Sequence, residues 1–375
     1  RAHGYFPNYL MENGEVFPMP QNYGFDMQNS YAHSKSPTSK HTYSKDGKLI
    51  PKGVKEPSKA TYSQNIIQEK ALNFISENKD EPFFLYYPTQ LPHGPLIVPD
   101  ISKFMDQPWD AKHKEWAAMM ELLDAHVGQI IKLLDELDIR DNTLILFSSD
   151  NGYSQWGYMG RKAHLNDPIF DNKGPWDKGK FIATDGGSRV PLVANWPNVI
   201  KPGTTSNQMV ALYDIFATAC DIADVNPPKI DGKSFLPILK GEFSANKKLH
   251  EYLYWENGSF NHNMQSARFR NWFAYRESYT DSIKVFDLSN DISCTKNLSE
   301  THPEIVKEAN TIFKNEHSPS KWYSNPEDTD EEIALKKEKA KTDFSKVTRP
   351  NSRQPKTMKE LKQMLDAQQT LLNDY

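Results

Sequence analysis

Asp150 and Asn151 are the residues whose types and spacing most clearly allow chemistry. They follow a run of strand-forming residues, 143–147, and two serines, and Gly152 comes directly after them. Both side chains carry oxygen atoms, the ligands that Ca²⁺ and Mg²⁺ prefer. Gly152 lets the backbone turn sharply after the pair. An Asp-Asn-Gly sequence is also typical of an ordinary turn that closes a strand, so the segment alone leaves both a cation site and a turn open.

Two further loops carry polar groups of a catalytic type. His93 lies between Pro92 and Pro95, which stiffen the backbone around it. An imidazole held in this way can act as a general acid near neutral pH. Lys180 follows Gly179 in a glycine-rich loop, where an ammonium group and accessible backbone suit an anionic substrate. Taken singly, a loop histidine is more often structural and a loop lysine is more often only solvated.

The elements around these residues predict an α/β domain. Apolar residues recur at helical spacing in some segments and run continuously in others. We predict helices over 61–77, 111–137 and 212–223, and strands over 82–87, 143–147 and 189–196. The run at 143–147 is typical of a buried strand that presents polar residues at its C-terminal end, where ligands bind in open α/β sheets. Strands that alternate with helices indicate a layered α/β fold.

The C-terminal part of the chain has a different pattern. Short strand-like pieces at 253–255, 267–275 and 283–288 precede a predicted helix at 303–315. Beyond residue 317 the chain becomes highly charged, which is typical of a solvated tail, with a terminal helix over 358–372 as its one candidate element. We therefore predict three parts, namely a catalytic portion at 1–226, a small α+β subdomain at 227–317 and a charged tail at 318–375.

Composition excludes several classes of function. The 375 residues carry a formal net charge of −4, so there is no electrostatic case for nucleic acid as a partner. No apolar run approaches the ~20 residues that a membrane-spanning helix needs. The two cysteines, Cys220 and Cys294, cannot build a disulfide framework and show no metal-ligand spacing. The oligomeric state is left open.

An ordered set of motifs resembles the type I sulfatases of the alkaline phosphatase superfamily. In chain order they are Pro-His-Gly-Pro at 92–95, a helix leading into Phe-Ser-Ser-Asp-Asn-Gly at 119–152, the counterpart of the family's Gly-x-Lys loop with Gly-Gly-x-Arg-Val-Pro at 179–191, an Asp-Gly-x-Ser segment at 231–241 and Phe-Asp-Leu … Asn-Leu at 286–298. The resemblance implies an alkaline-phosphatase-like mixed sheet flanked by helices. It also implies a smaller C-terminal α+β subdomain with an antiparallel sheet and a helix.

The resemblance implies a role for each matched residue. Asp150 and Asn151 match two ligands of a divalent cation, usually Ca²⁺, with Mg²⁺ as the alternative. His93 matches a sulfate-contacting histidine that helps protonate the leaving oxygen, and Lys180 matches a lysine that pairs with sulfate oxygens. Sulfate ester hydrolysis builds negative charge on these oxygens, and a cation, an ammonium group and a proton donor would stabilise it.

The substrate is expected to be a sulfated small molecule or carbohydrate. Arg161 and His164 lie with several aromatic residues between the Asp150–Asn151 pair and Lys180, where cations suit carboxylates or further sulfates. The ordinary alternative is a structural loop with solvated charges. Family members are usually periplasmic, secreted or lysosomal, and the resemblance implies such a setting here.

The family's nucleophile is the chief departure. It is a formylglycine made from Cys or Ser in a Cys/Ser-x-Pro/Ala-x-Arg motif, and neither Cys220 nor Cys294 lies in one. The resemblance therefore implies a formylglycine and further metal ligands upstream of Arg1, in a chain that begins partway through the catalytic domain. Two alternatives stay open. One is a phosphodiester or phosphonate hydrolase of the same superfamily, and the other is a non-catalytic module that kept half an anion site.

Overall fold

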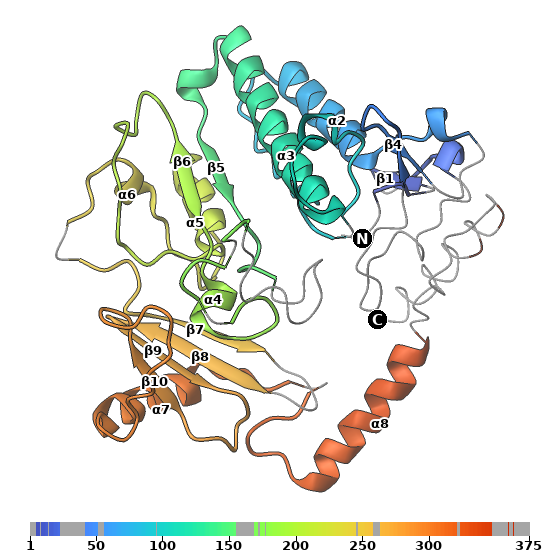
Figure 1. The fold of residues 1–375 in the computed structure, drawn as a ribbon. Coiled ribbons are helices and arrows are strands. Elements are labelled where there is room, and N and C mark those ends of the chain that lie inside the picture. The colour runs from blue at the N-terminus through green and yellow to red at the C-terminus, as the bar shows by residue number, and fades with distance from the viewer. Residues whose placement is uncertain are drawn as a thin grey trace. The chain divides into compact units, whose positions relative to one another are not determined.

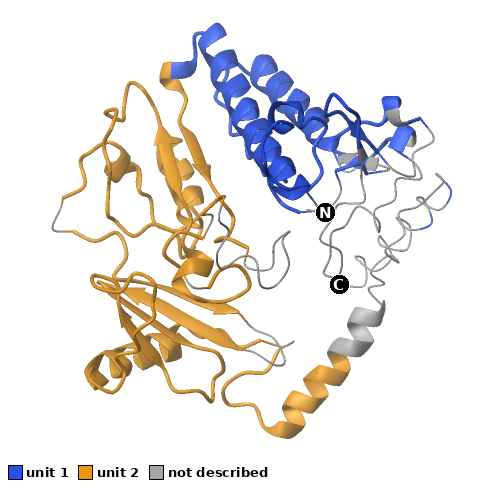
Figure 2. Ribbon diagram, viewed as in Figure 1, with its two compact units in different colours: residues 1–140, 156–164, 342–375 blue, residues 141–155, 165–341 orange. Residues whose placement is uncertain are grey.

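In the computed structural model the chain forms two compact units (Figures 1 and 2). Unit 1 comprises residues 1–140, 156–164 and 342–375, and unit 2 comprises 141–155 and 165–341. The structure describes residues 5–7, 9–13, 15–22, 42–51, 56–94, 96–154, 169–171, 173–176, 178–244, 247–257, 263–320, 323–346, 359 and 363.

Two long helices form the frame of unit 1, α2 at Ser63–Glu77 and α3 at Ala111–Glu136 (Figure 1). Both were predicted from their apolar spacing, and both predictions are confirmed. The Asp110 carboxylate begins α3 by accepting hydrogen bonds from the backbone amides of Lys112 and His113, at 2.9 and 3.0 Å. These bonds satisfy amides that have no partner inside the helix.

Short elements complete unit 1. Strand β1 (Tyr9–Glu12) pairs with β2 (Glu15–Pro18), and β3 (Thr42–Tyr43) pairs with β4 (Leu49–Ile50), both antiparallel. Single 3₁₀ turns lie at η1 (Pro20–Asn22), η2 (Pro57–Lys59) and η3 (Ser102–Phe104). A core packs between these elements and α3; its buried members include Tyr5, Tyr62, Ile97 and Met119. The N-terminal residues are therefore tied to the segment that carries His93.

The strand predicted at 82–87 is not formed. Residues 82–90 belong to no helix or strand, although exposure alternates along them as in an extended chain. Phe84 and Tyr86 are 66% and 77% exposed. An extended segment becomes a strand only through hydrogen bonds to a neighbour, and no described residue pairs with this one.

Strand β5 (Ile145–Ser148) and strand β6 (Leu192–Asn195) pair antiparallel in unit 2, with Ile145 opposite Asn195. The strands predicted at 143–147 and 189–196 are confirmed, and so is the helix at 212–223, which is α5 (Asp214–Ile222). The predicted burial is wrong, because β5 pairs with only one strand in the described part of the chain and Phe147 is 38% exposed. Among the described residues the expected mixed sheet is reduced to this two-stranded ladder. Short helical turns lie at η4 (Arg140–Asn142), α4 (Asp185–Ser188) and α6 (Leu236–Leu239).

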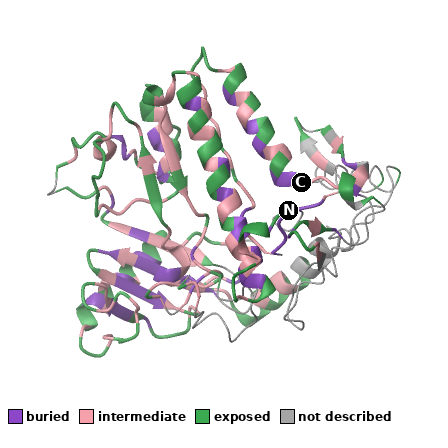
Figure 3. Ribbon diagram, turned by 45° about the horizontal axis from the view of Figure 1, so that its top comes forward, coloured by how far each residue is buried: buried purple, intermediate pink, exposed green. Residues whose placement is uncertain are grey.

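A four-stranded antiparallel sheet follows in unit 2, in the order β10-β9-β8-β7. Its strands are β7 (Tyr252–Asn257), β8 (Met264–Phe269), β9 (Trp272–Arg276) and β10 (Lys284–Asp287). Helix α7 (Pro303–Glu316) packs on it, and Ala267, Val285, Ala309 and Phe313 are buried between them (Figure 3). The predicted antiparallel sheet plus helix is confirmed. The piece at 267–275 is a hairpin rather than one strand, because the chain reverses at Arg270 with a φ of 50°.

The charged C-terminal region contains a helix that the sequence analysis does not predict. It contains helix α8 (Asp330–Lys346), and Ser324 ahead of it is buried and accepts a hydrogen bond from the Asn263 side chain at 2.6 Å. Apart from residues 359 and 363, the predicted terminal helix at 358–372 lies outside the described residues. The boundaries at 226 and 317 stay a prediction. Within the described part of the chain, no helix is both long and apolar enough to cross a membrane.

Candidate functional site

Asp150 and Asn151 lie directly after β5, where a serine pair fixes the backbone. The hydroxyl of Ser148 donates to the Pro191 carbonyl at 2.8 Å, and the hydroxyl of Ser149 donates to the Asn151 carbonyl at 3.0 Å. The Asn151 amide nitrogen donates to the Gly152 carbonyl at 2.9 Å. This bond uses the donor end of the amide and leaves its oxygen for another partner. The Asp150 residue is exposed, and its carboxylate has no ion pair or hydrogen bond with the described residues.

The loop that carries Lys180 is joined to this turn by two backbone hydrogen bonds. The Gly152 amide donates to the Gly187 carbonyl at 2.9 Å, and the Lys180 amide donates to the Tyr153 carbonyl at 2.8 Å. The segments lie so close that a Cβ on Gly152 would stand 1.8 Å from the Gly186 carbonyl oxygen. Only glycine permits that approach. The structure thus brings together Lys180 and the Asp150–Asn151 pair, which the sequence predicted as separate pieces.

A buried carboxylate anchors the far end of the Lys180 loop. Asp185 is 4% exposed and accepts hydrogen bonds from Arg189, at 2.7 Å from Nε and 3.1 Å from Nη2. The Trp176 indole donates to the same carboxylate at 3.2 Å, and Arg268 of β8 lies 3.5 Å from it. Bidentate contacts of this kind are both strong and directional. We did not single out Asp185 from the sequence, although its spacing of four residues from Arg189 was a usable signal.

The C-terminal sheet supports the same loop. Ala183 packs in a buried cluster with Phe273 and Tyr275 of β9. Lys178, two residues before Lys180, lies 3.3 Å from the Glu277 carboxylate, and this hydrogen bond lowers the pKa of Glu277. One lysine of the loop is therefore committed to a structural ion pair. The ammonium group of Lys180 lies 5.4 Å from the centre of the neighbouring Phe181 ring.

The His93 loop belongs to unit 1, where buried side chains hold its backbone. The Tyr5 hydroxyl donates to the carbonyls of His93 and Gln90, at 2.6 and 2.9 Å. Tyr5 is 1% exposed, and burial raises its pKa far above the ordinary value, so the hydroxyl stays protonated and keeps donating. The Gln90 amide in turn donates to the side chain of the buried Gln64 at 3.1 Å. Neither Tyr5 nor Gln64 was predicted as a supporting residue.

The ring of His93 has a defined orientation. Its Nδ1 lies 2.6 Å from the Gly94 carbonyl oxygen, and the preceding Leu91–Pro92 bond is cis. A carbonyl oxygen only accepts hydrogen bonds, so Nδ1 carries the proton. Nε2 is then the atom through which His93 can exchange a proton with a ligand.

The described residues offer the type of donor atom that a divalent cation prefers, but they supply only some of the ligands that it needs. Asp150 and Asn151 offer two side-chain oxygens, whereas Ca²⁺ takes six to eight oxygen ligands. The described part of the chain holds no group of three or more His, Cys, Asp or Glu side chains placed to bind a metal. Arg161 and His164, predicted to contact substrate, lie outside the described residues.

Cys294 is poorly suited to act as a nucleophile. Cys220 and Cys294 are both unpaired and partly buried. Burial raises the pKa of Cys294 to about 12, so its thiol is protonated at neutral pH. A protonated thiol is a poor nucleophile.

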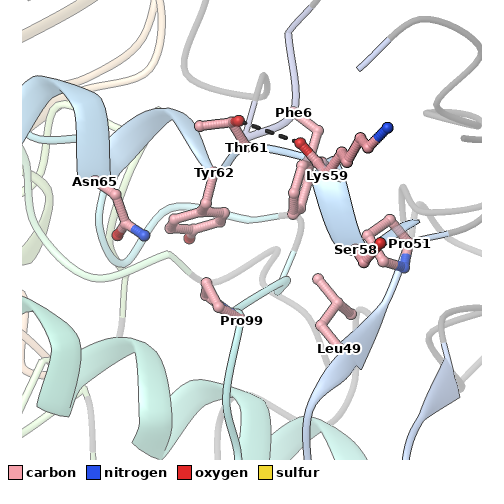
Figure 4. A pocket seen from close by; sticks show the side chains of 10 residues that line it. Phe6, Leu49, Pro51, Ser58, Lys59, Thr61, Tyr62, Asn65 and Pro99 are labelled. Atoms are coloured by element: carbon pink, nitrogen blue, oxygen red, sulfur yellow. Dashed lines mark hydrogen bonds between the residues drawn. The ribbon is translucent and has the colours of Figure 1, made fainter. Parts of the chain in front are cut away.

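A pocket of about 320 Å³ lies elsewhere in unit 1 (Figure 4). Its lining residues are Phe6, Leu49, Pro51, Ser58, Lys59, Ala60, Thr61, Tyr62, Asn65 and Pro99. It contains none of the candidate site residues and no acid or histidine. The pocket is therefore separate from the chemistry described above.

Comparison with known families gives two matches that together reach residue 316. The model described as Sulfatase matches residues 1–225, and the model described as N-sulphoglucosamine sulphohydrolase, C-terminal, matches residues 172–316. The two overlap on the loop that contains Lys180.

Individual relatives share the same description. An N-acetylgalactosamine-6-O-sulfatase of Bacteroides thetaiotaomicron is 28% identical over 279 residues, which is 67% of this chain and 50% of the relative. The human N-acetylgalactosamine-6-sulfatase is 31% identical over 187 residues, or 48% of this chain and 33% of the relative. The chain thus spans half or less of the length of these relatives.

Solved structures agree on the fold. A structure from work on the metabolism of multiple glycosaminoglycans by Bacteroides thetaiotaomicron gives a TM-score of 0.61 at 25% identity, over 82% of this chain and 69% of that chain. A second, described as Ps i-CgsB in complex with k-i-k-neocarrahexaose, gives a TM-score of 0.60 at 23% identity, over 77% of this chain and 62% of that chain.

Proposed function

Because this chain belongs to the sulfatase family, we propose that the protein it forms hydrolyses sulfate esters, with Asp150, Asn151, Lys180 and His93 in its active site. The observation that supports the proposal is the pair of backbone hydrogen bonds that join the Lys180 loop to the segment directly after Asp150 and Asn151. Two cation-binding oxygens and an ammonium group on segments joined in this way form an arrangement that suits the anionic oxygens of a tetrahedral sulfate ester.

Each residue has a distinct role in this proposal. Asp150 and Asn151 contribute side-chain oxygens to a divalent cation, Ca²⁺ or Mg²⁺, which when bound offsets negative charge on the sulfuryl oxygens. Lys180 pairs with those oxygens, and its backbone amide is fixed by Tyr153. In its imidazolium form, His93 passes the Nε2 proton to the leaving oxygen and becomes neutral, while Nδ1 keeps the proton that it donates to the Gly94 carbonyl. The nucleophile, a formylglycine, comes from outside these residues.

A sulfated carbohydrate is the substrate class that we propose. The relatives named above include sulfatases of N-acetylgalactosamine 6-sulfate, and another, the ulvan-active sulfatase of Formosa agariphila, is 30% identical over 192 residues, covering 48% of this chain and 33% of that relative. These names refer to N-acetylgalactosamine and to ulvan, and they support a carbohydrate sulfate ester as the substrate class.

The test uses the complete protein and two lysines of the same loop. Lys180→Ala removes the proposed anion partner, and Lys178→Ala removes an equal charge two residues away that is paired with Glu277. We expect Lys180→Ala and Asp150→Ala each to lower turnover of a sulfate ester by about 100-fold, the loss typical of one transition-state-stabilising group. In Lys178→Ala the turnover should fall by less than about tenfold.

The comparison also addresses the alternatives. Equal turnover by Lys180→Ala and Lys178→Ala would show that the site assignment is wrong. Faster turnover of an aryl phosphate than of the matching aryl sulfate would favour a phosphate or phosphonate hydrolase. A complete protein that turns over neither ester would favour a non-catalytic module.

A further inference from the structure

Phe181, the residue after Lys180, has a strained backbone conformation and an exposed side chain. Its φ is 74°, in the left-handed region that side chains with a Cβ rarely adopt. The other described non-glycine residues with positive φ are Asn13, Asp138, Asp224, Arg270 and Cys294, so Phe181 is the one large apolar side chain among them. It is also 62% exposed. Strain and exposure together make this residue unfavourable for folding, which indicates a role outside the core.

Hydrogen bonds on both sides hold the backbone in this strained state. The Lys180 amide donates to Tyr153 before Phe181, and the Ile182 amide donates to the Gly179 carbonyl at 3.2 Å after it. The Phe181 carbonyl accepts a hydrogen bond from the Asn257 side chain of β7 at 3.4 Å. The ring therefore projects from a fixed position rather than from a loose loop.

The ring lies next to the proposed anion partner. The Lys180 ammonium is 5.4 Å from the centre of the Phe181 ring. A ligand that meets both groups needs an anionic substituent for the ammonium and a flat, apolar C–H face for the negative face of the ring. A pyranose that carries a sulfate ester has both features on one small molecule.

We infer that Phe181 is a stacking platform for the sugar ring of a sulfated carbohydrate whose ester group meets Lys180. The inference rests on the proposed function, because it places the ester at Lys180. It makes Phe181 a residue that determines specificity for carbohydrate esters over sulfate itself.

The experiment measures binding of two probes, N-acetylgalactosamine 6-sulfate and inorganic sulfate, to the complete protein by isothermal titration calorimetry. Phe181→Gly should raise the dissociation constant of the sugar by about tenfold, as for loss of one aromatic stacking partner. The dissociation constant of sulfate should change by less than about twofold. Its thermal midpoint should stay the same or rise, since glycine accepts a positive φ without strain. Phe181→Trp should keep the sugar bound. Phe84→Ala alters a phenylalanine that is also exposed, at 66%, and should change neither probe.

The outcomes separate this inference from the proposed function. If Phe181→Gly binds the sugar as tightly as the wild type, while Lys180→Ala binds neither probe, then Phe181 is not a stacking platform and the proposed site at Lys180 is retained. If the wild type binds neither probe, or if Lys180→Ala changes neither, then the proposed site fails and the platform fails with it.

Discussion

The contact between Gly152 and the Lys180 loop is the feature whose disturbance the structure predicts most sharply. In Gly152→Ala the new Cβ would stand 1.8 Å from the carbonyl oxygen of Gly186 and 2.9 Å from its carbon. Both atoms are backbone, so no side-chain rotation relieves the overlap. The two segments must move apart, and the hydrogen bonds Gly152 to Gly187 and Lys180 to Tyr153 must lengthen or break.

The magnitude follows from those two bonds. Each backbone hydrogen bond contributes about 0.5–1.5 kcal/mol net, so their loss costs about 1–3 kcal/mol. Alanine also lowers the conformational entropy of the unfolded chain, which raises the free energy of unfolding by about 0.4–1 kcal/mol. We therefore expect Gly152→Ala to lower the free energy of unfolding by about 1–2 kcal/mol.

A matched control lies in helix α3. Gly128 is exposed and has no atom within 4 Å of an added Cβ. Gly128→Ala should raise the free energy of unfolding by about 0.8–1 kcal/mol, because alanine is the better helix former. The same glycine-to-alanine change is thus expected to lower the free energy of unfolding at one site and to raise it at the other. Urea unfolding measures both, and amide hydrogen exchange at Lys180 should accelerate about tenfold in Gly152→Ala alone.

Two results would refute this reasoning. One is a Gly152→Ala protein as stable as the wild type with unchanged exchange at Lys180. The other is a loss of stability in which the Lys180 amide stays protected, since the loop would then be held by contacts other than these two bonds.

Three further predictions concern groups away from that contact. Asp185→Asn should cost about 2 kcal/mol by urea unfolding, because Arg189 loses its buried, bidentate carboxylate. Asp214→Asn should cost a similar amount, since the fully buried carboxylate accepts from two backbone amides and from His250 Nε2 at 2.9 Å; a thermal midpoint unchanged in the variant would contradict this. Burial lowers the pKa of His126, so at pH values just below 6.5 this histidine takes up a proton in the unfolded chain but not in the folded one. The free energy of unfolding should therefore fall as the pH drops below 6.5, and it should fall less in His126→Gln.

The sequence by itself determined the local elements and the residue types of the site. Apolar spacing was sufficient for α2 and α3, and the Asp-Asn-Gly turn after β5 was correctly placed. The antiparallel C-terminal sheet with its helix was also predictable, because alternation and helical periodicity are properties of short segments.

Tertiary structure decided the pairings. Residues 82–87 have the composition of a strand, yet strand formation needs a neighbour that no local pattern supplies. The predicted piece at 267–275 became a hairpin because a reversal at Arg270 is set by packing of β8 against β9. The proximity of Lys180 to Asp150 depends on hydrogen bonds between segments about 30 residues apart in sequence, and on glycines that admit close backbone contact.

Most contacts that hold the Lys180 loop could not be predicted from the sequence, for the same reason. The spacing of Asp185 from Arg189 is a local signal, but Trp176 and Arg268 also surround its carboxylate, and no local pattern pairs them with it. The strained backbone of Phe181 is likewise a property of the folded loop, since no sequence pattern assigns a positive φ to phenylalanine. Residue types set which chemistry was available to this protein, whereas long-range backbone contacts decided which of those residues meet, because such contacts depend on the whole fold rather than on any one segment.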